Sequence, residues 1–220
     1  MRENIDVIKN SRLFAGIAEE SIAAMLSCLS VRCEKFSKND FIMRDGKHTD
    51  SLGMLLSGAA LVIREDYMGN RNIIANVAPG EIFAESYVCA EGAPLGVSVT
   101  AAKPSSVMFL GARRVLSVCS SACEFHLRIV RNLLSVLAEK NLSFSDKLTH
   151  VAYRTIRGKV LSYLHARSQA AGADEFEIPF DRQELADYLF VDRSALSAEL
   201  GKLRAEGLID FRKNRFSLKC

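Results

Sequence analysis

The sequence lacks the segments that direct a protein into or across a membrane. Its first ten residues, MRENIDVIKN, contain no apolar run, so we expect no signal peptide. The longest apolar stretch, LGMLLSGAALVI, is too short to span a bilayer and is interrupted by glycine and serine. We therefore expect a cytoplasmic protein that has no membrane partner.

The six cysteines form no CxxC motif, which favours free thiols in a reducing compartment. On a helix, Cys119, Cys123 and His126 would share one face, where they could form a metal or redox site. Small cysteines buried on a core face are commoner, so we expect neither a metal nor a cofactor.

No strong charge asymmetry identifies a partner. The net charge is +3, of which residues 151–220 carry +2. A local pattern is more informative, because a basic tail without acidic residues ends the chain; it contains Arg212, Lys213, Arg215 and Lys219. With 220 residues, 49% of them hydrophobic, the chain can form one large or two ordinary domains with a packed core.

Residues from about 30 to 112 are expected to form many short β-strands. Runs rich in β-branched and apolar residues, such as GAALVIRED and RNIIANVAPG, alternate with glycines at turn-like intervals. This pattern predicts a sandwich or a small barrel. About 30 residues with helical character precede it.

A long helix is expected next, because no proline or glycine occurs between Ala112 and Arg157. It carries a heptad seam whose strict spacing, with Asn141 as its polar member, favours a two-stranded parallel coiled coil and hence a homodimer. A helix packed on the barrel would also carry an apolar stripe, but one that drifts with the 3.6-residue period. The expected dimer interface consists of Leu127, Val130, Leu134, Leu137, Asn141, Phe144, Leu148 and Val151.

The segment PFDRQELADYLFVDRSALSAEL predicts two short helices joined by a tight turn. Asp181 and Glu184 have the spacing of a capping box, and Asp192 can cap the second helix, which Gly207 can end. The following segment, LIDFRKNRFSL, predicts a β-hairpin with Ile209 and Phe211 facing Phe216 and Leu218. Two helices and a hairpin in this order are typical of a winged helix-turn-helix.

One face of the second helix is lined by small residues, which an αα-hairpin that merely packs would not require. Such a face can enter a major groove, and basic wing residues suit phosphates. The expected DNA-binding residues are Arg182, Gln183, Asp192, Arg193, Ser194, Ser197, Ala198, Gly201, Lys202, Arg212, Lys213 and Arg215.

The motifs GEIFAES (residues 80–86) and RQELADYLFVDRSALSAEL (182–200), in this order, resemble the cyclic-AMP receptor protein / fumarate-nitrate reductase regulator (Crp/Fnr) superfamily of bacterial transcription factors. The resemblance implies an α+β chain. It would have a β jelly-roll (cyclic-nucleotide-binding-like) sensor barrel with N-terminal helices at 1–113, a dimerisation helix at 114–152 and a winged helix-turn-helix at 153–220. Expected partners are duplex DNA carrying an inverted repeat, a second copy, a small effector, and RNA polymerase if the protein is an activator.

Some residues of the sensor domain depart from the family's sequence pattern, and these departures bear on which effector the protein binds. In the cyclic-AMP branch the phosphate cassette reads Gly-Glu, then Arg-Ser about ten residues later. Here Ala84-Glu85 and Leu95-Gly96 take those places, so the arginine that would pair the cyclic phosphate is absent. The oxygen-sensing branch has an N-terminal cysteine cluster, whereas residues 1–27 contain no cysteine. We expect an apolar or aromatic effector with one polar group, and not cyclic AMP.

In the family's architecture the barrel leans on the dimer helix, which forms one wall of the effector pocket. The residues expected to line this pocket are Phe83, Glu85, Ser86, Leu95, Gly96, Asn141, Ser143, Phe144 and Ser145.

The DNA end departs from the family as well. Arg193 matches the family's arginine, but Ser194 and Ala198 replace a glutamate and a second arginine. Phe190 takes the place of the turn glycine, where a left-handed conformation would cost energy, so we expect a turn that is built differently.

Two other classes of function fit the sequence less well than DNA binding. Metal-dependent enzymes on jelly rolls need clustered histidines, but this barrel has His48 alone, and no phosphate loop or nucleophile elbow occurs, so we expect no catalytic residues. A sensor module that regulates a protein partner would not need the winged helix-turn-helix.

Overall fold

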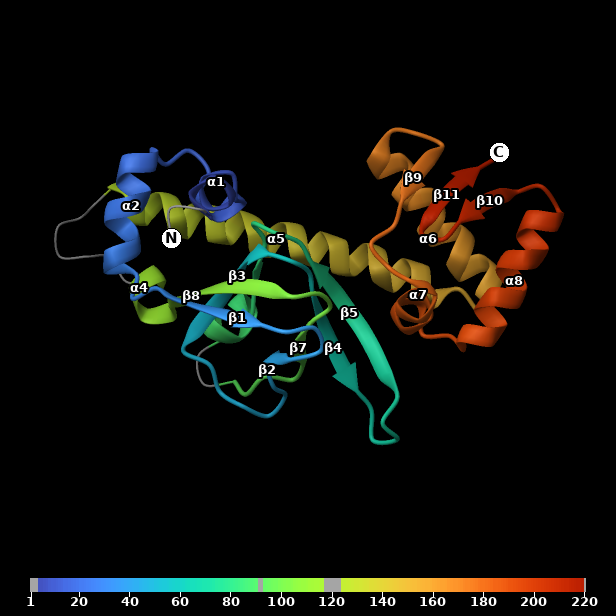
Figure 1. Cartoon of the computed structure of the whole chain (residues 1–220), viewed down its shortest axis with the longest axis horizontal. Coiled ribbons are helices and arrows are strands. Elements are labelled where there is room, and N and C mark those ends of the chain that lie inside the picture. Colours follow the sequence, from blue (N-terminus) through green and yellow to red (C-terminus); the bar gives the residue numbers. More distant parts are fainter. Residues whose placement is uncertain (1–3, 91–92, 117–123, 220) are drawn as a thin grey trace. The chain divides into compact units, whose positions relative to one another are not determined.

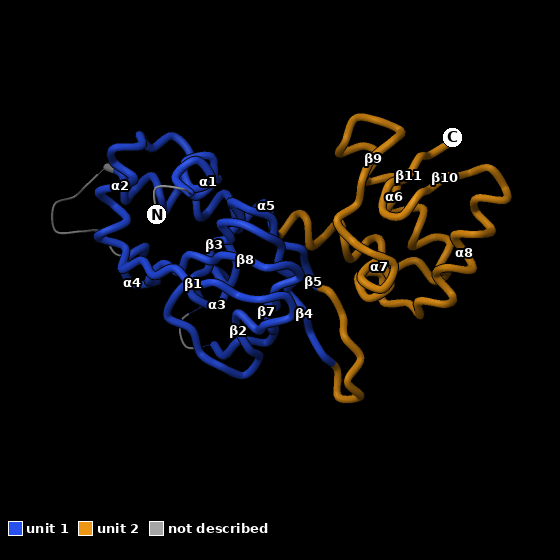
Figure 2. Tube along the Cα trace, in the orientation of Figure 1, with its two compact units in different colours: residues 1–65, 74–140 blue, residues 66–73, 141–220 orange. Residues whose placement is uncertain are grey.

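The computed structural model describes residues 4–90, 93–116 and 124–219, and it divides into two compact units (Figures 1 and 2). The first unit comprises residues 1–65 and 74–140, and the second comprises residues 66–73 and 141–220. The division falls within one long helix. The functional boundaries expected at residues 113 and 152 therefore stay predictions.

The first unit contains two four-stranded sheets, as expected for a jelly roll, except that the first three residues of one edge strand, 71–73, belong to the second unit. β3 carries a nearly continuous apolar run and is buried along most of its length, whereas β5 buries only Ile73 and Val77. The first sheet has the order β1 (Arg32–Phe36), β8 (Ser105–Gly111), β3 (Ser51–Ser57), β6 (Ile82–Phe83). The second has the order β2 (Phe41–Met43), β7 (Ser98–Ala101), β4 (Ala60–Glu65), β5 (Arg71–Val77).

A buried apolar cluster that includes Leu55, Phe83, Val99 and Phe109 joins residues of the two sheets. Gly53 is required where β3 pairs with β6, because a Cβ there would lie 2.1 Å from the ring of Phe83. The phenylalanine of the GEIFAES motif is therefore accommodated by the absence of a side chain on the neighbouring strand.

A second core lies under the N-terminal helices and the long helix α5 (Glu124–Ala152). Ile129, Leu133 and Val136 of α5 are buried there with Phe14 and Met108. The other helices of this unit are short; they are α1 (Ile5–Lys9), η2 (Arg12–Phe14), α2 (Glu19–Cys28), α3 (Glu85–Cys89) and α4 (Ala112–Leu116). Within the described residues, no helix combines the length and the apolarity that crossing a membrane requires.

Besides residues 66–73, the second unit contains the end of α5, a three-stranded antiparallel sheet and three further helices. Its elements are α6 (Ile156–Ala171), β9 (Glu175–Glu177), α7 (Arg182–Leu189), α8 (Arg193–Ala205), β10 (Ile209–Arg212) and β11 (Arg215–Leu218). The expected hairpin, with Ile209 and Phe211 facing Phe216 and Leu218, is confirmed: Ile209 pairs with Leu218 and Phe211 with Phe216.

The expected helix ends are confirmed as well. Asp181 and Glu184 form a reciprocal capping box at the start of α7. The carboxylate of Asp192 accepts from the backbone N–H of Ala195 at 2.9 Å, and Gly207 has φ +76 just after α8. These local signals fix where the two helices begin and end.

Candidate nucleic-acid interface and effector site

The structure exposes the small-residue face of α8. Leu196, Leu200 and Leu203 are fully buried in the second unit. The exposed residues on α8 include Arg193, Ser194, Ser197, Ala198 and Gly201. The helix therefore presents a slim polar face with an arginine at its N-terminal end, the shape and chemistry that major-groove entry requires.

The turn before α8 corrects one expectation. Phe190 adopts the left-handed conformation, with φ 53, so the turn is built as it would be with glycine. The backbone N–H of Val191 donates to the carbonyl of Ala186 at 3.1 Å, which closes the end of α7. A phenylalanine in this conformation is strained, and its surroundings must compensate.

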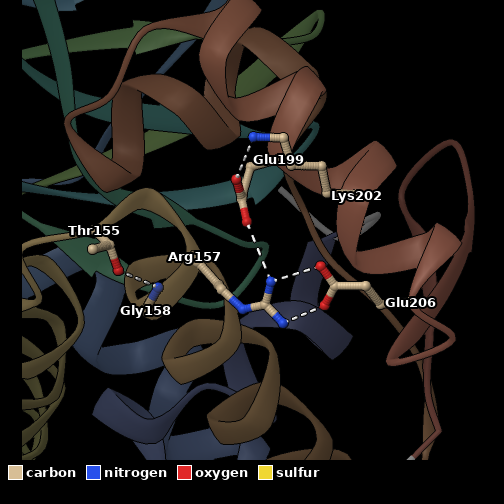
Figure 3. A network of polar contacts seen from close by, with 6 residues as sticks. All are labelled: Thr155, Arg157, Gly158, Glu199, Lys202 and Glu206. Carbon is tan, nitrogen blue, oxygen red and sulfur yellow. Dashed lines mark hydrogen bonds and ion pairs between the residues drawn. The ribbon is translucent and has the colours of Figure 1, made fainter.

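Arg157 of α6 joins two glutamates of the α8 region (Figure 3). Its guanidinium donates to both oxygens of Glu206, and lies 3.8 Å from Glu199. Hydrogen bonding to Glu206 raises the pKa of Arg157. Lys202, which was expected to contact DNA, lies 3.7 Å from the same Glu199. The sequence pattern did not single out this network, which orients α8 against α6.

Two guanidinium groups lie against the ring of Phe211 in the wing, which is the hairpin formed by β10 and β11. Arg182 lies 4.6 Å and Arg204 5.1 Å from the ring centre of Phe211, and Arg204 also pairs with Asp210 at 2.7 Å. Arg182 lies over the ring of Phe216 as well, and burial lowers its pKa. The guanidinium of Arg182 thus makes cation–π interactions within the domain, which the sequence did not predict. Its role as a DNA contact stays a prediction.

A Phe211→Leu variant is expected to bind specific and random DNA about tenfold more weakly. It removes two cation–π interactions of about 0.5–1 kcal/mol each, which loosens the wing. Phe211→Tyr keeps the ring and should bind like the wild type. Fluorescence anisotropy measures both, with thermal unfolding to verify folding. Wild-type affinity in Phe211→Leu would contradict this role.

The other expected DNA contacts are also placed by the structure. Arg212 and Lys213 are exposed on the wing, whereas Arg215 pairs with Glu175 at 3.0 Å. Gln183 donates to Asp187 at 2.7 Å. Their roles in DNA binding stay predictions.

On the sensor side, Glu85 meets a helix residue that the sequence pattern did not single out. Lys140 of α5 lies 3.0 Å from the carboxylate of Glu85, which is only 5% exposed, and donates to the carbonyl of Ile82 at 2.5 Å. Ser86 donates to the second oxygen of Glu85 at 3.4 Å. Both carboxylate oxygens of the cassette glutamate are therefore engaged.

Leu95, which takes the place of the arginine that pairs the cyclic phosphate in the cyclic-AMP branch, is buried. Leu95 is 2% exposed, and its backbone bonds to Gly46 and Lys47 at 2.7 and 2.8 Å. A Cβ on Gly96 would lie 3.3 Å from the hydroxyl of Tyr87, so a phenol borders this place. Phe83, another barrel residue expected in the pocket, is buried as well.

Comparisons with known proteins agree with this two-part organisation. The model of the cyclic nucleotide-binding domain matches residues 33–122, and that of the Crp-like helix-turn-helix domain matches residues 158–219. The chain belongs to the Crp/Fnr superfamily. No curated protein sequence matches it significantly.

Solved structures share the fold of this Crp/Fnr protein at low identity. CLP, a c-di-GMP-responsive global regulator of Xanthomonas campestris, has a TM-score of 0.73 and 19% identity, over 89% of this chain and 98% of CLP. FixK2 from Bradyrhizobium japonicum has a TM-score of 0.67 and 19% identity, over 87% and 94% of the two chains. A CRP-family transcriptional regulator from Thermus thermophilus has a TM-score of 0.60 and 22% identity, over 84% and 91%.

The family makes this protein a DNA-binding transcription regulator with a cyclic nucleotide-binding-type domain. The family match does not favour the alternative of a sensor that acts only on a protein partner, because such a sensor would have no use for the matched helix-turn-helix domain.

In this Crp/Fnr regulator the heptad seam lies largely on the exposed side of α5. Leu127, Leu134, Phe144 and Leu148 are between 49% and 61% exposed in the single chain. Val130 and Val151 are half-buried, Asn141 is exposed, and Leu137 packs partly against the sensor core. The seam thus remains available for a partner.

The helix residues expected in the effector pocket belong to the second compact unit. Asn141, Ser143, Phe144 and Ser145 are all exposed there. Lys140 of α5 pairs with Glu85, one of the barrel residues expected in the pocket. The helix wall stays a prediction.

The possible metal or redox site lies largely outside the described residues, because Cys119 and Cys123 do. His126 is buried, and its Nδ1 has no hydrogen-bond partner among the described residues. In that part of the chain, no group of three or more histidine, cysteine or acidic residues is placed to hold a metal.

Proposed function

We propose that the protein is a homodimeric transcription regulator that reads an inverted repeat and responds to a small effector other than cyclic AMP. The exposed small-residue face of α8, with Arg193 at its N-terminal end, carries the proposal. Two such helices related by a two-fold axis would read half-sites about one helical turn, ~34 Å, apart. If the protein activates transcription, RNA polymerase is a further partner.

The exposed seam of α5 supports the homodimer. Large apolar side chains with coiled-coil spacing are exposed in the single chain, and a second copy of the same helix would bury them. Asn141 within the seam would pair with its symmetry mate and so select register and a two-stranded state.

The barrel supports an effector other than cyclic AMP. Buried Leu95 provides no charge for a cyclic phosphate, and Glu85 is already paired with Lys140. The likeness in fold to CLP, which responds to c-di-GMP, fits a barrel whose effector is not cyclic AMP.

Selection of genomic fragments by the purified protein, followed by gel shifts, tests the proposal. We expect recovered fragments to share an inverted repeat that is bound much more tightly than random duplex. Recovery of fragments without a common repeat, or binding that is equal on random DNA, would contradict it.

Calorimetry is expected to show no cyclic-AMP binding at micromolar concentration and physiological salt. A buried phosphate without a cationic partner would cost several kcal/mol. Leu95→Arg should strengthen cyclic-AMP binding by restoring the cation, whereas Leu95→Met should not. Micromolar binding by the wild type would contradict this part of the proposal.

A further inference from the structure

A lysine ammonium is buried beside the turn of the helix-turn-helix. Lys147, near the end of α5, is 4% exposed. Its Nζ lies 4.1 Å from the ring centre of Tyr188 and 4.9 Å from that of Phe190, and it donates to the carbonyl of Ile73. These residues all belong to the second compact unit. Charged side chains are rarely buried unless their partners compensate for lost hydration.

The two rings belong to residues at the end of α7 and in the turn that follows it. Tyr188 lies in the last turn of α7, and its ring packs 4.8 Å from Phe180 and 5.3 Å from Tyr163, centre to centre. Phe190 is the left-handed residue between α7 and α8. The ammonium therefore contacts both a fixed ring and the residue whose strain has to be compensated.

A second lysine stabilises the backbone of the same turn. Lys159 of α6 donates to the carbonyls of Leu189 and Phe190 at 3.1 and 3.4 Å. Lys147 acts on the side chains of the turn and Lys159 on its carbonyls. Burial lowers the pKa of Lys147 to about 8, so its charged form still predominates at neutral pH.

We infer that Lys147 is a positioning residue for DNA recognition. By holding the rings of Tyr188 and Phe190, its ammonium stabilises the left-handed turn and so fixes the direction in which α8 leaves α7. A residue of the expected dimer helix thereby sets the geometry of the DNA-reading helix. This inference rests on the DNA contact proposed for α8.

Substitution of Lys147 tests the inference in the full-length protein. Lys147→Met keeps the apolar stem but removes the charge, and we expect about tenfold weaker binding to the selected inverted repeat. Lys147→Arg keeps a cation that stacks on aromatic rings, and should stay within about threefold of the wild type. Lys38→Met makes the same chemical change at an exposed site of the sensor, and should have no effect.

Lys147→Met in a Phe190→Gly background tests whether Lys147 affects DNA affinity through the left-handed turn. Glycine adopts the left-handed conformation without strain, so Lys147→Met should cost less than about twofold in that background. If Lys147→Met alone fails to fold, the double mutant should fold.

Three outcomes would overturn the inference: wild-type affinity in folded Lys147→Met, equal losses for Met and Arg, or an undiminished defect in the Phe190→Gly background. Failure of the wild type to bind any repeat would instead refute the proposed DNA contact.

Discussion

A Leu134→Asp/Leu148→Asp double mutant is expected to sediment as a monomer and to lose affinity for the inverted repeat by at least about 100-fold. Leu134 and Leu148 are 61% and 53% exposed, so in one chain the change disturbs little packing. In the coiled coil each aspartate would face its symmetry mate, which places like charges across an apolar seam. A monomer also loses the gain from binding two half-sites at once, which is typically 10²–10⁴-fold.

Leu142→Asp is the matched control, because Leu142 is 68% exposed on the same helix but lies one residue beyond the seam position of Asn141. It should remain dimeric in analytical ultracentrifugation and bind DNA normally. If the double mutant stays dimeric, the interface lies on another surface. If it is monomeric yet binds the repeat with wild-type affinity, the paired half-site reading is wrong.

Features with local sequence signals were predicted well. The Asp181 capping box, the Asp192 cap and the register of the wing hairpin depend on residues a few positions apart, and the structure confirms them. The buried leucines of α8 follow from its helical period in the same way. The family resemblance, confirmed by two domain models, added the order of the parts.

Features made by residues distant in sequence could not be predicted. Lys140 meets Glu85 across 55 positions, and the guanidinium of Arg182 lies on the ring of Phe211 across the helix-turn-helix. Nothing in the neighbourhood of Lys140 or Lys147 distinguishes either from a solvated lysine on a helix. Only the packing of strands and helices around them does so.

At Phe190, tertiary contacts override the local preference for glycine in a left-handed turn. The cost of a left-handed phenylalanine suggested a differently built turn, but the observed φ is 53. The cation beside its ring and the lysine on its carbonyl supply compensating interactions from α5 and α6. Both lysines lie far from Phe190 in the sequence, so the residues of the turn itself do not reveal the compensation.

Substitutions of Arg193 and Lys213 are expected to affect DNA affinity differently. Loss of Arg193 should weaken binding to the specific repeat, and loss of Lys213 should weaken binding to any duplex. Arg193 is the first residue of α8 and is exposed, which suits a bidentate contact to a guanine edge. Arg193→Ala should cost about 1–3 kcal/mol on the selected repeat, or roughly 5- to 150-fold, and relax the preference at one base pair of each half-site. Lys213 lies at the tip of the wing hairpin and is exposed, which suits a phosphate contact.

Lys213→Ala should therefore weaken binding to every sequence alike and reduce the slope of log affinity against log salt by about one for each phosphate that is no longer neutralised. Competition assays on the repeat, on single-base variants of it and on random duplex, each at several salt concentrations, measure both effects. Arg193→Lys is the discriminating control, because it keeps the charge but not the planar fork, and it should lose base preference while retaining the salt slope. An equal loss on the repeat and on random DNA for Arg193→Ala would assign Arg193 to the phosphates, and base recognition would then belong to other residues of the α8 face.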